Sequence, residues 1–79
     1  MPDYHGIVRD IVKQLVNKPD AVEVTSDRSD SGAVMVTIST DVDDVGRVIG
    51  KRGATINAIR LVAKAAAVKP GEKVDVDLA

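Results

Sequence analysis

Apolar residues in the first part of the chain come in pairs that recur every four positions. The pairs are Ile7 and Val8, Ile11 and Val12, and Leu15 and Val16. This spacing places all of them on one face of an amphipathic helix, which we expect to run from Tyr4 to Asn17. Pro19 then ends the helix, because proline disfavours helical angles at the residue before it.

Two stretches of alternating apolar and polar residues follow this helix. Within Ala21 to Arg28 and within Ala33 to Thr40, apolar side chains occupy every second position. Such alternation is typical of strands that have one buried and one wet face. The turn-forming run Ser29 to Gly32 separates the two stretches, so we expect them to form a hairpin.

Helical spacing returns in the second half of the chain. The acidic run Asp41 to Asp44 can cap a helix, since a carboxylate accepts hydrogen bonds from free backbone N–H groups. We expect a short helix from Asp44 to Ile49, stopped by Gly50, and a longer helix from Ala54 to Val68. After a Pro-Gly breaker, alternation predicts a last strand that contains Val74, Val76 and Leu78.

These elements predict one α+β domain over residues 1–79, in the order α-β-β-α-α-β. We expect a three-stranded sheet with all three helices packed on one face. The last strand follows a helical crossover, and such crossovers usually join parallel strands. The sheet should therefore be mixed, with one antiparallel and one parallel pair.

Charge is unevenly distributed along the chain, although the net charge is only −1. All twelve acids lie at or before Asp44 or at or after Glu72. The segment between them carries six basic residues and no acid, so it is +6, while the remainder has five bases and twelve acids and is −7. A basic segment of this kind can attract an anion to one face of the domain. The alternative interpretation is a solvated helix surface that happens to be basic.

The run Gly50-Lys51-Arg52-Gly53 lies inside this basic segment, between two predicted helices. Glycine permits the tight turn, and the next helix begins with free N–H groups that attract phosphate. Two other interpretations fit less well. A nucleotide-binding P-loop needs four residues between its glycines and a Ser or Thr after the lysine, but Gly46 and Gly50 enclose three and Arg52 follows Lys51. A plain helix-turn-helix corner explains the glycines but not the two cations.

The run I-G-K-R-G-A-T-I at positions 49–56 resembles the I-G-x-x-G-x-x-I signature of KH domains. The order α-β-β-α-α-β resembles their type II arrangement, and the whole chain is similar to the small single-domain bacterial KH proteins of the KhpA type. The resemblance implies that about four nucleotides of single-stranded RNA or DNA bind against the glycine loop. The residues implied in binding are Arg47, Val48, Ile49, Gly50, Lys51, Arg52, Gly53, Ile56 and Arg60.

Each of these residues has a role that the resemblance implies. The loop from Gly50 to Gly53 would hold phosphates, and three aliphatic residues, Val48, Ile49 and Ile56, would form an apolar floor for the bases. Arg47 and Arg60 would flank the groove, and the strand Ala33 to Thr40 would offer its edge as the opposite wall. The resemblance further implies a homodimer or a complex with a larger KH-containing protein, in post-transcriptional regulation or as an RNA chaperone.

Composition narrows the remaining classes of function. The chain has no Phe or Trp and a single Tyr, so it cannot stack bases on an aromatic platform. With one histidine, His5, and no cysteine, no nucleophile has an evident partner base, so we expect no enzyme and no cofactor. Asp41, Asp43 and Asp44 lack the spacing of a calcium loop, so we expect no metal site.

The sequence also bears on where the protein works. We see neither an export signal nor an apolar run long enough to span a membrane, and cysteine is absent. We therefore expect a cytoplasmic protein without membrane contact. A protein-interaction module with weak or vestigial RNA binding is the alternative to an RNA-binding protein.

Overall fold

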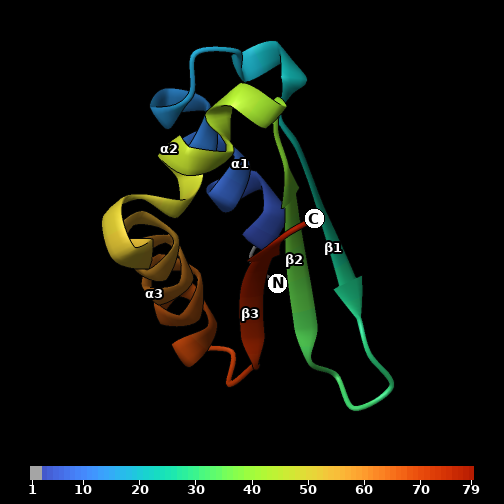
Figure 1. Ribbon diagram of the computed structural model, residues 1–79. Helices are drawn as coiled ribbons and strands as arrows, with labels where there is room; N and C mark the ends of the chain where they lie inside the picture. The colour runs from blue at the N-terminus through green and yellow to red at the C-terminus, as the bar shows by residue number, and fades with distance from the viewer. Residues whose placement is uncertain (1–2) are drawn as a thin grey trace.

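The computed structural model describes residues 3–79, and it confirms the predicted order of helices and strands (Figure 1). The elements are α1 (Tyr4–Leu15), β1 (Glu23–Arg28), β2 (Val34–Ser39), α2 (Val45–Ile49), α3 (Ala54–Val68) and β3 (Val74–Leu78). Short 3-10 turns lie at Pro19–Ala21, Val42–Asp44 and Lys51–Gly53. None of the helices in this part of the chain is long and apolar enough to cross a lipid bilayer.

The first helix is shorter than the sequence predicted. It ends at Leu15, and Val16 is already extended, with φ −104° and ψ 158°. The N–H groups of Asn17 and Lys18 donate instead to the carboxylate of Asp44, at 3.1 and 3.0 Å. This carboxylate replaces the helical carbonyl partners that the two groups would otherwise need.

The sheet is mixed, as predicted, and its strand order is β1-β2-β3. β1 and β2 form an antiparallel hairpin, and β3 lies parallel to β2 on its other side. β2 is therefore hydrogen-bonded along both edges, and the prediction that it offers a free edge as the wall of a groove is wrong. The free edge beside α3 belongs to β3, because the parallel crossover places β3 between the helix and the central strand.

All three helices lie on one side of the sheet (Figure 1), where α1 and α3 contact the strands and α2 packs against these two helices. α1 contacts β1, β2 and α3, while α3 lies along β3. Within residues 3–79, the core consists of fifteen buried apolar residues, most of them valine and isoleucine, and each buried valine or isoleucine contributes about 1.5–3 kcal/mol when it leaves water. The opposite face of the sheet is uncovered, and the register places Asp27, Met35 and Asp75 side by side there.

A hydrogen-bonded cluster fastens the start of α1 to the turn before β3. The Tyr4 hydroxyl donates to Glu72 Oε1 at 2.6 Å, and Arg28 Nη2 lies 2.7 Å from Glu72 Oε2. Burial, together with the hydrogen bond to Glu72, raises the pKa of Tyr4 to about 12. The hydrogen bonds from Tyr4 and Arg28 lower the pKa of Glu72.

Candidate nucleic-acid interface

The turn between α2 and α3 requires a backbone that side chains rarely allow. Gly50 has φ 75°, Arg52 has φ 57° and Gly53 has φ 78°. Among residues 3–79, Arg52 is the one non-glycine residue with a positive φ. A left-handed conformation costs a non-glycine residue about 1–2 kcal/mol, so this loop is held in place by its surroundings.

Gly50 is also required because there is no space for a side chain. A Cβ at this position would overlap the Thr55 hydroxyl and lie 2.8 Å from the Thr55 backbone nitrogen. At Gly53 the nearest atom to such a Cβ would be Asn57 Nδ2, at 3.8 Å, so only the positive φ favours glycine there. The loop thus folds back closely onto the first turn of α3.

The N-terminus of α3 has no side-chain cap, although the N–H of Ala54 donates to the carbonyl of Lys51. Gly53 occupies the N-cap position and has no side chain with which to cap the helix. The first N–H groups of a helix, with the helix dipole, favour a negative charge at such an end. The missing Cβ atoms of Gly50 and Gly53 allow a sugar-phosphate chain to come close to the protein backbone.

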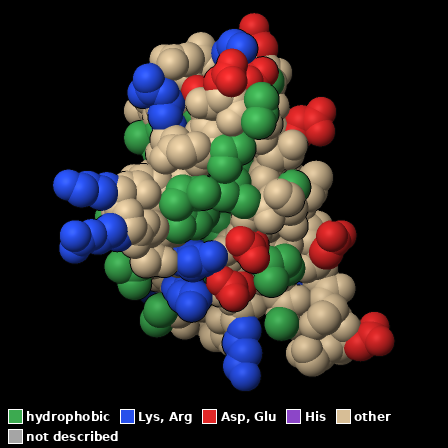
Figure 2. Space-filling model, viewed as in Figure 1, with side chains coloured by type: hydrophobic (Ala, Val, Ile, Leu, Met, Phe, Trp, Pro, Cys, Tyr) green, Lys and Arg blue, Asp and Glu red, His purple; other side chains and the backbone are tan. Residues whose placement is uncertain are grey.

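Lys51 and Arg52 supply the long-range attraction at the same position. Both side chains are exposed, and neither forms an ion pair within residues 3–79. Figure 2 shows two cationic side chains projecting into solvent from the edge of the molecule beside the α2–α3 junction. Their charge is therefore fully available to a ligand.

Arg47 is held by neighbouring residues and not left free. Its Nε lies 3.7 Å from Oδ1 of Asp44, which is only 1 % exposed. The Asn17 amide oxygen, turned toward Arg47, accepts from Nε at 3.2 Å and Nη2 at 3.1 Å. The acidic run caps the 3-10 turn Val42–Asp44, where Asp41 accepts from Asp43 N, but it gives α2 no side-chain cap, because the Asp44 side chain binds the chain after α1 instead.

The three aliphatic residues of the predicted floor differ in exposure. Val48 is fully buried at 0 % and Ile56 is 7 % exposed, whereas Ile49 is 36 % exposed. Val48 therefore supports this surface from below, in contrast to the prediction that it forms part of it. Figure 2 shows an apolar area at the centre of this face, with cations on the side of the α2–α3 junction.

The far side of this area is the free edge of β3, where Arg60 is already engaged. Arg60 Nε donates to the Val76 carbonyl at 2.7 Å, and Nη1 donates to Asn57 Oδ1 at 2.9 Å. Its guanidinium also lies 3.6 Å from Asp75 Oδ1 and 3.7 Å from Asp77 Oδ1. Below the apolar area, Figure 2 shows cationic and acidic side chains in contact where α3 meets β3.

Sequence reasoning missed Asn57, Asp75 and Asp77 as neighbours of the site. Two signals could have found them. Gly53, Asn57 and Arg60 follow at intervals of four and three, so they share one face of α3. The alternation Val-Asp-Val-Asp in the last strand repeats the same acid at every second position, next to a helix that carries an arginine.

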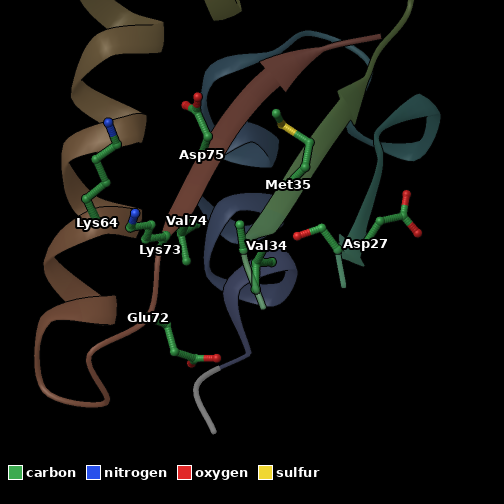
Figure 3. Close-up of a pocket in the computed structure, with 10 residues that line it drawn as sticks. Asp27, Val34, Met35, Lys64, Glu72, Lys73, Val74 and Asp75 are labelled. Carbon is green, nitrogen blue, oxygen red and sulfur yellow. The ribbon is translucent and has the colours of Figure 1, made fainter. Parts of the chain in front are cut away.

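A wide hollow lies elsewhere in the described part of the chain. It has a volume of about 650 Å³ and opens at the start of β2 and β3. Figure 3 shows Lys64 and Lys73 on one side of it and Asp27 on the other, with Val34, Met35 and Val74 between them. None of the residues predicted to bind RNA lines it. Within residues 3–79, no three His, Cys, Asp or Glu side chains are grouped as a metal site requires.

Comparison with known proteins gives a family for nearly the whole chain. The family described as KhpA/KhpB, KH domain, matches residues 6–78. RNA-binding protein KhpA of Caldanaerobacter subterraneus is 39 % identical over 72 residues, which are 91 % of this chain and 95 % of the relative. RNA-binding protein KhpA of Bacillus subtilis is 35 % identical over 80 residues, 99 % of this chain and 98 % of the relative.

Two solved structures share the fold. The chain resembles Aquifex aeolicus Era bound to GDP and aluminium fluoride with a TM-score of 0.67 and 20 % identity. It resembles Era in complex with MgGDPNP and nucleotides 1506–1542 of 16S ribosomal RNA with a TM-score of 0.67 and 21 % identity. The alignments cover 95 % of this chain but only 29 % and 28 % of the Era chains, so the likeness concerns the fold of one part of Era.

Proposed function

Because the chain belongs to the KhpA/KhpB family of KH domains, we propose that it is a non-catalytic protein that binds single-stranded RNA through its GKRG loop. Its element order and mixed sheet are those of the type II KH fold. The domain acts in the cytoplasm, in post-transcriptional regulation or as an RNA chaperone. Single-stranded DNA of equal length competes for the same site, since the contacts at the loop address phosphates.

One observation carries this function: the exposed cations Lys51 and Arg52, which have no ion pair within residues 3–79, lie between two glycines at a helix start that has no side-chain cap. Backbone N–H groups at the start of α3 bind a phosphate oxygen, and the two side chains bind the neighbouring phosphates. Ile49 offers an aliphatic surface to the bases, with Val48 and Ile56 beneath it. Such a surface binds weakly, because it lacks aromatic rings and meets only about four nucleotides.

Reversing the loop charges tests this assignment. In the double variant Lys51→Asp, Arg52→Asp we expect no measurable binding of a fluorescent single-stranded RNA at low salt. The domain should still fold, because both side chains lie on an exposed turn. The double variant Lys13→Asp, Lys69→Asp is the matched control, since it makes the same change in net charge at exposed lysines away from the loop.

The two variants distinguish a site from general attraction. If the control loses as much affinity as the loop variant, RNA responds to net charge alone and the loop is not the site. If the unchanged protein binds no RNA at low salt but still associates with a protein, the domain is a protein-interaction module with vestigial RNA binding.

We further propose that a second copy of the chain docks on the outer face of α3. Leu61 and Val68 are 70 % and 76 % exposed, and Ala65 between them is exposed as well. Positions 61, 65 and 68 form one helical stripe, so an identical stripe can pack against it. A dimer presents two GKRG loops to one strand, and this compensates for the weak affinity of each loop.

Leu61→Lys should therefore shift the protein toward the monomer in light scattering. Val42→Lys is the matched control, because Val42 is an aliphatic side chain that is 82 % exposed outside α3. A dimer that survives Leu61→Lys would place the contact on another surface. Another KH protein of the same family could bind to this surface in place of the second copy. In that case Leu61→Lys should weaken the heterodimer as well.

A further inference from the structure

The free edge of β3 already has partners for several of its own backbone groups. The backbone groups of Lys73 and Ala79 bond to β2, so the odd-numbered residues face that strand and Val76 and Leu78 face outward. The outward N–H groups of Val76 and Leu78 donate to the carboxylates of the residues that precede them, Asp75 and Asp77, both at 2.8 Å. The outward Val76 carbonyl accepts from Arg60 at 2.7 Å. A base that reaches this edge therefore meets side chains before it meets the strand backbone.

Arg60 presents the remaining donors at this edge. A guanidinium has five N–H groups, and in Arg60 one is bonded to Val76 and one to Asn57. The other three, one on Nη1 and two on Nη2, form no hydrogen bond within residues 3–79, although Nη2 lies 3.7 Å from Asp77. The Arg60 side chain is 31 % exposed, so part of it can be reached by a ligand, and its remaining N–H groups are on the neighbouring atoms Nη1 and Nη2.

The position of Arg60 is tied to the loop through Asn57. Asn57 Nδ2 would lie 3.8 Å from a Cβ at Gly53, so this side chain sits against the loop, while its Oδ1 accepts from Arg60. Gly53, Asn57 and Arg60 thus follow one face of α3 from the phosphate-binding turn to the edge of β3. A strand whose phosphates lie at the loop can direct its bases toward Arg60.

The carboxylates at this edge favour the same orientation. Asp75 and Asp77 are 57 % and 68 % exposed in their side chains, and they repel phosphates from β3. They also fix the guanidinium, since both lie within 4 Å of it. The phosphates are therefore attracted to one side of the interface and excluded from the other, and this leaves the base edges for Arg60.

We propose that Arg60 is a specificity-determining residue, which selects bases that present two adjacent hydrogen-bond acceptors. This inference rests on the proposed RNA binding. Two parallel N–H groups of a guanidinium fit O2 and N3 of cytosine, or O6 and N7 of guanine. Uracil has an N–H group between its two carbonyls, and adenine has an amino group beside N7, so neither offers a matching pair. The interface therefore prefers cytosine to uracil and guanine to adenine.

Oligocytidine and oligouridine of equal length provide the test, because they match in phosphate number and ring size. We expect the unchanged protein to bind oligocytidine about tenfold more tightly, within the range of a bidentate base contact. Arg60→Lys keeps the charge but removes the fork, so it should retain affinity for oligouridine and bring the ratio of the two affinities close to one. Arg60→Met should do the same to the ratio and also weaken binding of both.

The outcomes distinguish this inference from the proposed function. If the unchanged protein binds both oligonucleotides equally, or if Arg60→Lys keeps the preference for cytidine, Arg60 does not read bases, while the loop assignment stands. Binding of neither oligonucleotide would overturn both. Lys64→Gln, one helical turn further along α3, is the control and should leave the ratio unchanged.

Discussion

The GKRG loop and the free edge of β3 carry cations in opposite states. At the loop, Lys51 and Arg52 are exposed and form no ion pair within residues 3–79. At the edge, Arg60 is hydrogen-bonded to Val76 and Asn57 and lies beside two carboxylates. A free cation attracts phosphate from a distance. The field of a paired cation is largely cancelled by its partner, but the orientation of its side chain is fixed.

This difference assigns separate tasks to residues of the same type. The basic segment of the sequence carries six cations, yet Arg47 and Arg60 are paired with acids that come from outside this segment. The net charge of a segment therefore overstates what is available to RNA. Affinity should depend on the loop, and orientation and selectivity on the paired arginines.

The largest effect should come from breaking the loop itself. Gly50→Ala places a Cβ against Thr55, whose backbone nitrogen cannot move without distorting α3. We expect a loss of about 3 kcal/mol in the free energy of unfolding, from strain at a positive φ together with the overlap, and a loss of RNA binding. Urea denaturation and fluorescence anisotropy measure the two effects.

Gly46→Ala is the control for this substitution. Gly46 lies within α2, and a Cβ there would meet no atom within 4 Å. Alanine is favoured over glycine in a helix by roughly 0.5–1 kcal/mol, so the variant should be slightly more stable and should bind RNA normally. Equal damage from both substitutions would mean that the space at Gly50 is not what the loop requires.

The next effect concerns salt and separates free from paired cations. For a single strand, the slope of log K against log salt is about 0.7 per phosphate neutralised. Lys51→Gln, Arg52→Gln should lower the steepness of this slope by about 1.4, because both charges are free. Arg47→Gln should change it by less than half of the effect of one loop charge, since Asp44 already balances Arg47. Equal slopes for Arg47 and the loop residues would contradict the division of tasks.

A smaller effect should follow when the paired arginine is released. Asp75→Asn, Asp77→Asn removes two charges that lie within 4 Å of Arg60 and repel RNA. We expect affinity at low salt to rise about threefold, which corresponds to a surface charge interaction of about 0.6 kcal/mol. Glu23→Gln, Asp27→Asn is the control on β1, the strand furthest from Arg60 in the sheet. A rise of the same size in the control would show that general charge, and not the pairing, limits binding.

The fold could be predicted from the sequence because periodicity and breakers act locally. The stripe of α3 and the alternation of the strands were read correctly to within two residues of each end. The glycine loop could also be found, since few sequences place cations between glycines at a helix junction. The family resemblance then supplied the roles of the loop residues, which remain predictions.

The relations between distant segments could not be read in the same way. β2 lies between two strands because β3 joins the hairpin on the side of β2. The alternation of residues within a strand does not indicate which side the third strand joins. The burial of Val48 and the pairing of Arg60 with Asp75 and Asp77 depend on that same placement. Asp44 looked like a cap because it precedes α2, but its carboxylate serves the chain 26 and 27 positions earlier.

The smallest effect on RNA affinity should come from a change in the cluster of Tyr4, Glu72 and Arg28. We expect these paired side chains to have no role in RNA binding. It lies near the C-terminal end of α3, about 20 Å along this helix from the GKRG loop. Burial and the bond to Glu72 raise the pKa of Tyr4 to about 12, so the folded protein keeps a proton that the unfolded chain releases near pH 10. Stability should therefore fall as pH rises from about 10 to 12, because the unfolded state binds fewer protons there.

The absorbance of tyrosinate measures the ionisation of Tyr4 directly, since Tyr4 is the single tyrosine of the chain. Urea denaturation at each pH measures the stability. Tyr4→Phe should remove the alkaline fall in stability that Tyr4 causes, and it should leave RNA affinity at neutral pH unchanged. The hydrogen bond from Tyr4 is the main reason why the pKa of Glu72 is lowered. Without this bond, protonation of Glu72 costs less stability, so Tyr4→Phe should lose less stability than the unchanged protein when the pH falls below about 4.5. A change in RNA affinity would mean that this end of the domain is coupled to the loop through α3, and that pairing and binding are not separable as the two regions suggest.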